Sequence, residues 1–204
     1  NYEHFFRGTL DGQKKVISNI TVIVQPPSEW GGAFTGFVGR NHGILKDINL
    51  TEISISGVND GLVYVGGITG FNYGEIISCN VSGTISVTGQ GTAAGGLVGR
   101  NEEKGKITDC RANVNVSATS AVPDLSSSAG GFAGLNSNGA TITNCVVSGG
   151  TVTARHTQGG LVAKGSFLGV QTEHNNTLSG NRADGSPKIG RDARKSPPDP
   201  SDDI

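Results

Sequence analysis

A short glycine-rich phrase recurs five times along this chain, and its spacing constrains the fold more than any other feature. The copies are TGFVGRN ending at Asn41, GGITGFN at Asn72, GGLVGRN at Asn101, GGFAGLN at Asn136 and a decayed GGLVAKG at Gly165. The aligned second glycines, Gly36 to Gly160, are separated by 31, 29, 35 and 29 residues. A unit of this length cannot bury a core by itself, so the units are expected to stack.

A second pattern lies between the phrases, where one apolar residue is followed three and five positions later by two others. The sets are Ile17, Ile20 and Val22; Leu45, Ile48 and Leu50; Ile76, Cys79 and Val81; Ile107, Cys110 and Ala112; and Ile142, Cys145 and Val147. A further patch with a period of two follows, at Ile53 and Ile55, Ile85 and Val87, Val114 and Val116, and Val152 and Ala154. This spacing predicts about three short strands per unit, separated by turns.

The unit length decides between the repeat folds that contain short strands. A propeller blade usually needs about 40 residues and four strands. We therefore expect an all-β fold, a right-handed parallel β-helix (β-solenoid) of about five coils with 29–35 residues each. The expected organisation is a solenoid with a lead-in coil over residues 1–170, an irregular capping coil over 171–192 and a proline-rich linker or tail over 193–204.

Composition and charge narrow the possible partners. Glycine supplies 33 of 204 residues, which suggests corners that need positive φ. The formal net charge of −1 gives no electrostatic reason to expect nucleic-acid binding, and the apolar runs are too short for membrane insertion. A chain that begins at Asn1 and contains no Met is expected to be a monomeric module of a longer protein.

Two columns of identical residues are interpreted as structural. Asn41, Asn72, Asn101 and Asn136 are expected to form an asparagine ladder at a corner, where Asn tolerates left-handed geometry; a ligand-binding row is the alternative. Cys79, Cys110 and Cys145 occupy a column that holds Ile in earlier units. They are therefore predicted to be buried thiols, with a disulfide as the weaker alternative and no metal or cofactor site.

An enzymatic interpretation would rest on one further column. It consists of Asn19, Asp47, Ser78, Asp109 and Asn144. Its two carboxylates would lie two coils apart, roughly 10 Å, which is at or beyond the spacing of an inverting glycosidase pair. Solvated corner residues are the preferred interpretation, so the chain is predicted not to be an enzyme.

Binding residues are predicted on one strand face and two loops. Small polar side chains alternate with the apolar residues of the period-two patch. The candidate binding residues among them are Thr84, Ser86, Thr88, Thr151 and Thr153. Such a face can be plain solvated sheet, bind a glycan or protein, or bind ice. Insertions at 25–34 and 117–129 add Trp30 and Asp124, because loops on a rigid scaffold often carry recognition.

The phrases GGITGFN, GGLVGRN and GGFAGLN, with the following GxIxxC, resemble the GLUG motif of bacterial surface proteins over residues 5–165. Similar proteins include adhesin-like chains and the noncatalytic repeats of metallopeptidases that cleave immunoglobulin A. The resemblance implies a secreted or cell-surface module serving adhesion, display or spacing, with a host protein or glycan as partner. The alternatives are an accessory region of such a peptidase and a carbohydrate-binding or carbohydrate-active β-helix.

Overall fold

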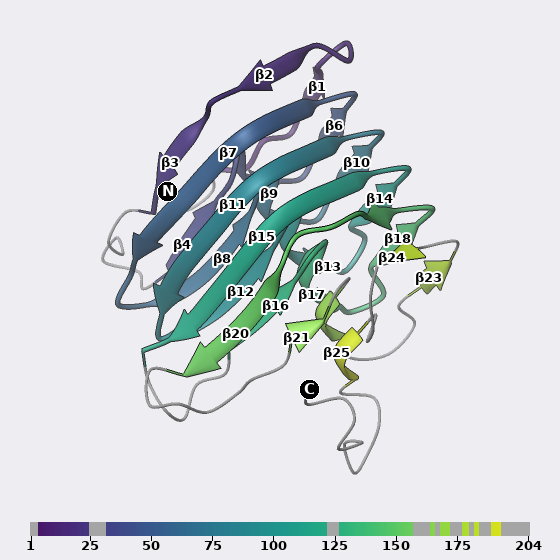
Figure 1. The fold of residues 1–204 in the computed structure, drawn as a ribbon. Coiled ribbons are helices and arrows are strands. Elements are labelled where there is room, and N and C mark those ends of the chain that lie inside the picture. The colour runs from purple at the N-terminus through teal and green to yellow at the C-terminus, as the bar shows by residue number, and fades with distance from the viewer. Residues whose placement is uncertain are drawn as a thin grey trace.

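The chain forms a stack of coils in which every strand pairs with the equivalent strand of the next coil (Figure 1). The computed structural model describes residues 4–24, 32–121 and 127–156, and the strand segments 164–165, 168–171, 177–179, 182–183 and 189–192. Within these ranges the secondary structure is β-strand and the pairings between strands are parallel. The prediction of an all-β parallel solenoid is confirmed.

Four parallel sheets make up the walls of the stack. The first contains β1 (Thr9–Asp11), β6 (Ile44–Lys46), β10 (Glu75–Ile77), β14 (Lys106–Thr108), β18 (Thr141–Thr143) and β23 (Thr177–Ser179). The second contains β2 (Val16–Ser18), β3 (Thr21–Ile23), β7 (Asn49–Val58), β11 (Asn80–Gly89), β15 (Arg111–Ser120), β19 (Val146–Val147), β20 (Val152–His156) and β24 (Arg182–Ala183). The third contains β4 (Gly32–Thr35), β8 (Leu62–Gly66), β12 (Gly91–Gly95), β16 (Ser127–Gly130) and β21 (Lys164–Gly165). The fourth contains β5 (Val38–Asn41), β9 (Thr69–Asn72), β13 (Val98–Glu102), β17 (Ala133–Ser137), β22 (Leu168–Gln171) and β25 (Ile189–Asp192).

A complete coil therefore has four strands, and the prediction of about three was wrong. Each glycine-rich phrase follows one short strand and enters another, as β8 and β9 show on either side of residues 67–68. Conversely, the last residue of each three-residue apolar set and the period-two patch that follows it lie on a single long strand, since Val81 and Ile85 both belong to β11. In β7 the equivalent residues, Leu50 and Ile55, are one position farther apart, and a bulge at Glu52, with φ of 55°, keeps both turned inward.

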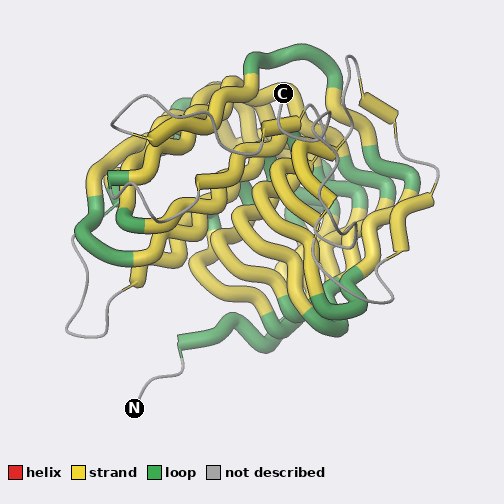
Figure 2. The backbone as a smooth tube through the Cα atoms, turned by 90° about the horizontal axis from the view of Figure 1, so that it is seen from below, coloured by secondary structure: helices red, strands yellow, loops and turns green. Residues whose placement is uncertain are grey.

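The phrase glycines are required by close packing, which corrects the expectation that they supply positive φ. A Cβ on Gly70 would lie 2.5 Å from both the Tyr64 carbonyl oxygen and the Thr35 nitrogen. A Cβ on Gly67 would lie 2.5 Å from Cγ1 of Val81, on the opposite wall. The phrase is therefore buried in the coil, and at Gly70 the backbone of β9 packs directly against the backbone of β8. Successive coils nest on this bend, as the view roughly along the stack shows (Figure 2).

The first coil is registered differently from the prediction, which aligned Ile17 with Leu45 and Ile20 with Ile48. In the structure Leu10 pairs with Leu45, and Ile17 pairs with Leu50. The corner between β1 and β2 has four residues where that between β6 and β7 has two, and its Gln13 and Lys14 both adopt positive φ. This insertion shifts the lead-in segment, and an apolar pattern alone does not reveal such a shift.

The interior is filled by stacked aliphatic and thiol side chains from all four walls. Leu45, Ile76, Ile107 and Ile142 form one fully buried column, in register along the first sheet. Phe132 is the largest fully buried side chain of the described residues. The core is essentially aliphatic. Most other described aromatic side chains lie on the outside of the walls, where they form part of a second surface.

Candidate functional site

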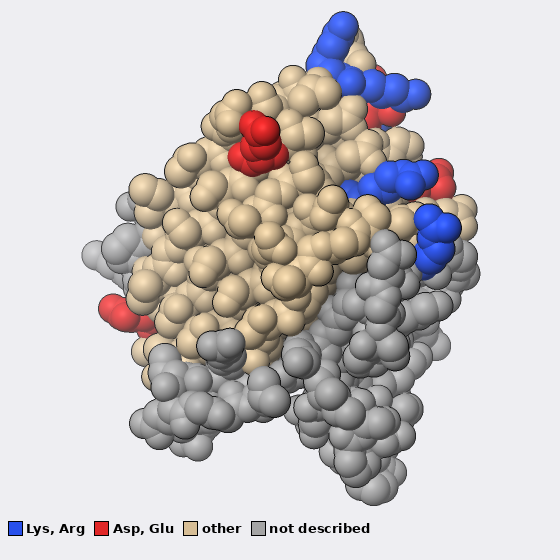
Figure 3. Space-filling model, viewed as in Figure 1, with Lys and Arg blue, Asp and Glu red and all other residues tan. Residues whose placement is uncertain are grey.

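The predicted polar face lies on the long second sheet, on the outside of β7, β11, β15 and β20. We call it the hydroxyl–amide face; it consists of Ser54, Ser56, Thr84, Ser86, Thr88, Asn113, Asn115, Ser117, Thr151 and Thr153. These side chains are exposed or half-buried, and the face carries almost no charge (Figure 3). In chemical terms it offers weak, neutral hydrogen-bonding groups over a flat area.

Register brings the predicted residues of this face together. Thr84 pairs with Asn115, and both the nitrogen and the hydroxyl of Thr151 donate hydrogen bonds to Oδ1 of Asn115, at 2.9 and 3.1 Å. Ser86 pairs with Ser117, which pairs with Thr153. Thr88 lies in β11 with Thr84 and Ser86, two residues after Ser86 and near the C-terminal end of the strand. The predicted loop residues Trp30 and Asp124 lie outside the described residues.

The four phrase asparagines form a continuous hydrogen-bonded ladder inside the corner between the fourth and first sheets. The Nδ2 of Asn41 donates to Oδ1 of Asn72 at 2.8 Å, and the same 2.8 Å bond joins Asn72 to Asn101 and Asn101 to Asn136. All four side chains are fully buried. They lie at or near strand ends without positive φ, so hydrogen bonding, and not left-handed geometry, explains Asn here.

The three cysteines are buried at the corner between the first and second sheets. Each thiol lies near the carbonyl oxygen two residues earlier, at 3.4 Å for Cys79, 3.1 Å for Cys110 and 3.3 Å for Cys145. Burial raises the pKa of the Cys110 thiol well above its ordinary value. The environment of Cys110 therefore disfavours thiolate chemistry.

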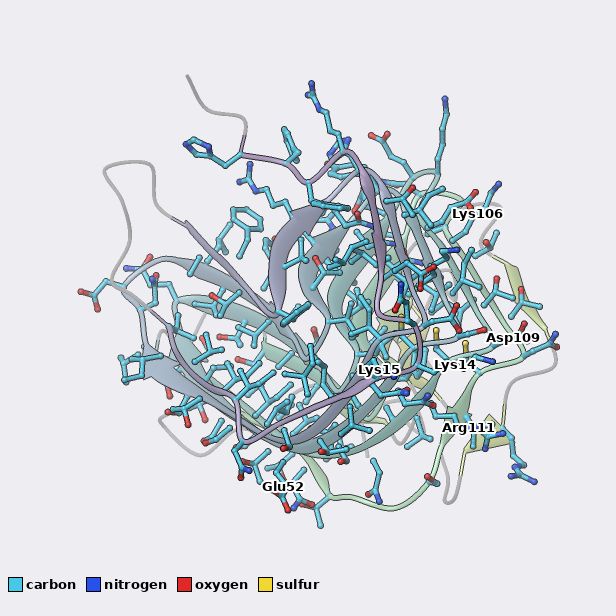
Figure 4. All side chains as sticks on the ribbon, turned by 90° about the horizontal axis from the view of Figure 1, so that it is seen from above. Lys14, Lys15, Glu52, Lys106, Asp109 and Arg111 are labelled. Atoms are coloured by element: carbon cyan, nitrogen blue, oxygen red, sulfur yellow. The ribbon has the colours of Figure 1, made fainter. Side chains whose placement is uncertain are left out.

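The column considered for catalysis forms the outer side of this same corner. Asp47, Ser78, Asp109 and Asn144 share φ values of 53° to 55° and turn the chain from the first sheet into the second. Asn19 does not join them, because its nitrogen bonds to Thr51 near the bulge of β7. Figure 4 places Asp109 at the outside of the rod, among Lys14, Lys106 and Arg111. Small polar residues fit this corner because they tolerate positive φ.

A second surface was missed by the sequence analysis and lies on the third and fourth sheets, behind the long sheet in Figure 1. We call it the aromatic–arginine cluster; it consists of Phe5, Phe34, Arg40, His42, Tyr64, Phe71, Tyr73 and Arg100. Their rings form a connected set. Phe71 lies 4.9 Å from Tyr73, 5.4 Å from Tyr64 and 5.5 Å from Phe34, measured between ring centroids.

The two arginines of the cluster stand in one column but have different partners. Arg40 and Arg100 both pair in register with Phe71, from opposite sides. Arg100 forms an ion pair with the nearly buried Glu102, which also accepts a hydrogen bond from Ser137 at 2.7 Å. Burial lowers the pKa of Arg100, but the hydrogen bond and charge of Glu102 more than offset this, so its pKa is raised.

Arg40 instead lies with its guanidinium carbon 3.7 Å from the ring centroid of Phe34 and 5.4 Å from that of Phe5. Among the described residues no carboxylate pairs with Arg40. The guanidinium is thus held over the face of a ring, and no ion pair with a described carboxylate neutralises its charge.

A groove of about 690 Å³ runs beside the cluster across several coils. His42 and Tyr73 form part of one side, and Gly8, Gly43, Gly74 and Gly139 lie along it. Thr9, Ile44, Glu75, Lys106 and Thr141 from the first sheet also line it, with Lys106 3.4 Å from Glu75, and the remaining lining residues are Arg7, Glu103 and Lys104. The groove therefore combines ring faces, bare backbone and hydrogen-bonding side chains.

The sequence did contain a signal for this surface. Phe34, Arg40 and Phe71 lie in or beside the repeated phrases. The later coils have Ala93 and Ser128 in the column of Phe34, and Arg100 and Leu135 in the column of Phe71. The deviation from the repeat was informative, although its residues lie in separate units and only stacking brings them together. No helix in the described part of the chain has the length and apolarity needed to cross a membrane.

Comparison with known proteins supports the repeat assignment. The GLUG motif matches residues 90–117, which include β12 to β14 and most of β15, and residues 126–153, which include β16 to β19 and the start of β20. A curated relative, "Halomucin" from Haloquadratum walsbyi, is 33% identical over 111 residues, which is 53% of this chain and 1% of that protein. No solved structure matches the chain. The two matched segments, within residues 90–153, are thus GLUG repeats.

Proposed function

We propose that this chain is a noncatalytic, extracellular repeat module of a larger cell-surface protein, serving adhesion, display or spacing. The observation that carries the proposal is the continuous in-register stack of four parallel sheets. Such a stack fixes the direction of every outer side chain relative to its neighbours. Such a stack therefore suits a spacer or display module, which must hold its outer side chains in fixed positions along its length.

The internal ladders give the module the rigidity that this role requires. The asparagine bonds connect four successive coils through side chains, in addition to the backbone pairing. Each added coil lengthens the stack by about 4.8 Å without changing its cross-section. Length can thus be adjusted by repeat number alone.

The comparisons support a surface location. The GLUG motif and a relative named as a mucin fit a surface repeat module. The chain spans about 1% of that relative, so only the repeat region is compared. We propose in addition that residues 171–192 form an irregular coil that caps the stack and that residues 193–204 form a linker or tail.

The polar side chains support a noncatalytic role. Asp47 and Asp109 belong to one corner column with a full coil between them, roughly 10 Å apart by strand spacing. The nearly buried Glu102 is engaged by Arg100, Ser137 and Asn138. These carboxylates therefore have structural environments, in contrast to the close acid and base of a glycosidase.

Surface display is tested on intact cells that produce the full-length protein. An antibody raised against the folded module is expected to label intact cells, and brief protease treatment of those cells is expected to remove the label. A cytoplasmic protein serves as the control for cell integrity. Labelling that appears only after permeabilisation would contradict the proposed location.

A further inference from the structure

The aromatic side chains of this chain are concentrated in an unusual place. Only 5% of the residues are Phe, Trp or Tyr. Aromatic rings usually contribute strongly to cores, yet among the described residues Phe132 is the fully buried one. Five others, with His42, form the ring system of the aromatic–arginine cluster on the outside of the stack.

Stability of the fold does not explain this gathering. The coils with Ala93 and Ser128 at the position of Phe34 and Tyr64 stack in the same register. The coil with Leu135 at the position of Phe71 does so too. Half-buried aromatic and arginine side chains on an outer surface, at positions where the repeat does not need them, are typical of recognition surfaces.

The charge around the cluster favours an anionic ligand. Arg7, Lys104 and Lys106 line the groove against Glu75 and Glu103. Arg40 adds a further cation in the adjoining cluster, 5.4 Å from the ring of Phe5, which in turn lies 4.0 Å from His42 of the groove. Glu75 is already paired with Lys106. This region is therefore cationic in a chain whose formal net charge is −1. A half-buried guanidinium without an acidic partner is well suited to bind a carboxylate.

The groove favours a ligand with both an apolar and a polar side. The rings of His42 and Tyr73 lie 4.5 Å apart between centroids and form a continuous wall across two coils. Thr9, Thr141 and the Glu75–Lys106 pair provide hydrogen-bonding groups in the same groove. A sugar ring has an apolar C–H face and a rim of hydroxyl groups, which match these two kinds of lining. The glycines allow such a ring to approach the backbone closely.

We propose that the aromatic–arginine cluster and its groove bind an acidic saccharide, with sugar rings stacked along His42 and Tyr73 and a carboxylate on Arg40. This assignment deepens the proposed adhesive role and rests on it for its biological setting. Its test uses the purified chain, so a negative result would refute the saccharide site and leave surface display to its own experiment.

The probes separate charge from ring recognition. Polygalacturonate supplies carboxylates on sugar rings, its methyl ester keeps the rings without the charge, poly-glutamate keeps the charge without sugar rings, and dextran is a neutral polysaccharide. Binding is measured by isothermal titration calorimetry at two salt concentrations. Polygalacturonate is expected to bind most tightly, its ester about tenfold or more weakly, and dextran and poly-glutamate more weakly still.

Two variants test the named residues. Arg40→Gln is expected to weaken polygalacturonate binding about tenfold, the effect of losing a hydrogen bond between charged groups. Tyr73→Ser is expected to weaken binding of both polygalacturonate and its ester, because it removes the stacking surface. Arg111→Gln is the matched control, since it removes the same charge from the exposed far corner seen in Figure 4. Circular dichroism confirms that each variant is folded.

Three results would overturn the proposal. The first is no binding of polygalacturonate by the folded wild-type chain. The second is an equal loss of affinity in Arg40→Gln and Arg111→Gln, which would show nonspecific attraction between charges. The third is binding of poly-glutamate as tight as that of polygalacturonate, which would identify an acidic peptide and not a saccharide as the preferred ligand.

Discussion

The hydroxyl–amide face and the aromatic–arginine cluster are built by the same repeat but differ in how faithfully they repeat. On the first, Ser86 pairs with Ser117, so similar groups recur from coil to coil. On the second, the column of Phe71 contains Arg40, Arg100 and Leu135, so neighbouring coils differ in charge and shape. A face that repeats can be explained by stacking alone. On a face that varies, the charge and shape of the side chains are not required for stacking, so they indicate a further role.

The largest effect on stability is expected from Gly70→Ala, which tests how tightly the backbone is packed at the bend behind the aromatic–arginine cluster. The new Cβ would lie 2.5 Å from backbone atoms of Tyr64 and Thr35, and neither can move without separating the strands. We expect a loss of about 3 kcal/mol or more in unfolding free energy, measured by chemical denaturation. Gly8→Ala is the control, because its nearest contact is a ring atom at 3.7 Å. Equal stability of the two variants would show that the bend is not tightly packed.

Asn101→Ala tests the interior that both surfaces share. The substitution leaves Nδ2 of Asn72 and Oδ1 of Asn136 without their ladder bonds in a fully buried corner. The expected loss is about 1 to 3 kcal/mol in thermal or chemical unfolding. The exposed Asn113 of the hydroxyl–amide face provides a matched Asn113→Ala variant, expected to stay within about 0.5 kcal/mol of wild type. A wild-type melting temperature for Asn101→Ala would refute a stabilising ladder.

Alkaline pH is expected to act on the aromatic–arginine cluster and not on the hydroxyl groups of the other face. Burial raises the pKa of Tyr73 above 10.0, and the charges of Glu102 and Glu103 raise it further. The folded state therefore favours the protonated phenol. This contribution is fully present below the unfolded-state pKa and is lost as pH rises through the higher folded-state pKa.

The measurement compares phenolate absorbance and unfolding free energy of wild type and Tyr73→Phe across this pH range. Stability of wild type is expected to fall more steeply with pH than that of the variant. Identical slopes would mean that Tyr73 titrates as it does in the unfolded chain.

The smallest effect is expected from Ser86→Gln, at the centre of the hydroxyl–amide face. Ser86 is exposed and pairs with Ser56 and Ser117. The unfolding free energy should change by no more than about 0.5 kcal/mol. Polygalacturonate affinity, measured as above, should equal that of wild type, because the added side chain lies away from the cluster. A marked loss of binding would reassign the ligand to this face.

Much of the fold could be predicted because stacked positions leave a periodic record in the sequence. The phrase spacing predicted the solenoid, and the shared column of Ile48 and Cys79 predicted a buried corner. The number of strands per coil could not be obtained in this way. A bend such as that between β8 and β9 depends on how closely two backbones approach, which leaves no period in the apolar residues.

The candidate site was less predictable than the fold. Thr84 and Ser86 were identifiable because they alternate with core residues on one strand. Phe5, Phe34 and Tyr73 come from three different coils, and no short-range pattern links them. The register of the lead-in segment was also needed, since the pairing of β1 with β6 and the bridge between Phe6 and Asn41 place Phe5 against His42, with ring centroids 4.0 Å apart.

The sequence by itself determined that this protein is a repeat, that its repeats stack, and which asparagine and cysteine columns recur, because identical units must present identical residues at equivalent positions. The tertiary structure alone decided which residues that break the repeat come together. Stacking aligns positions about 30 residues apart within one strand spacing, so the partners of Arg40 and Phe71 are fixed by register and not by distance along the chain.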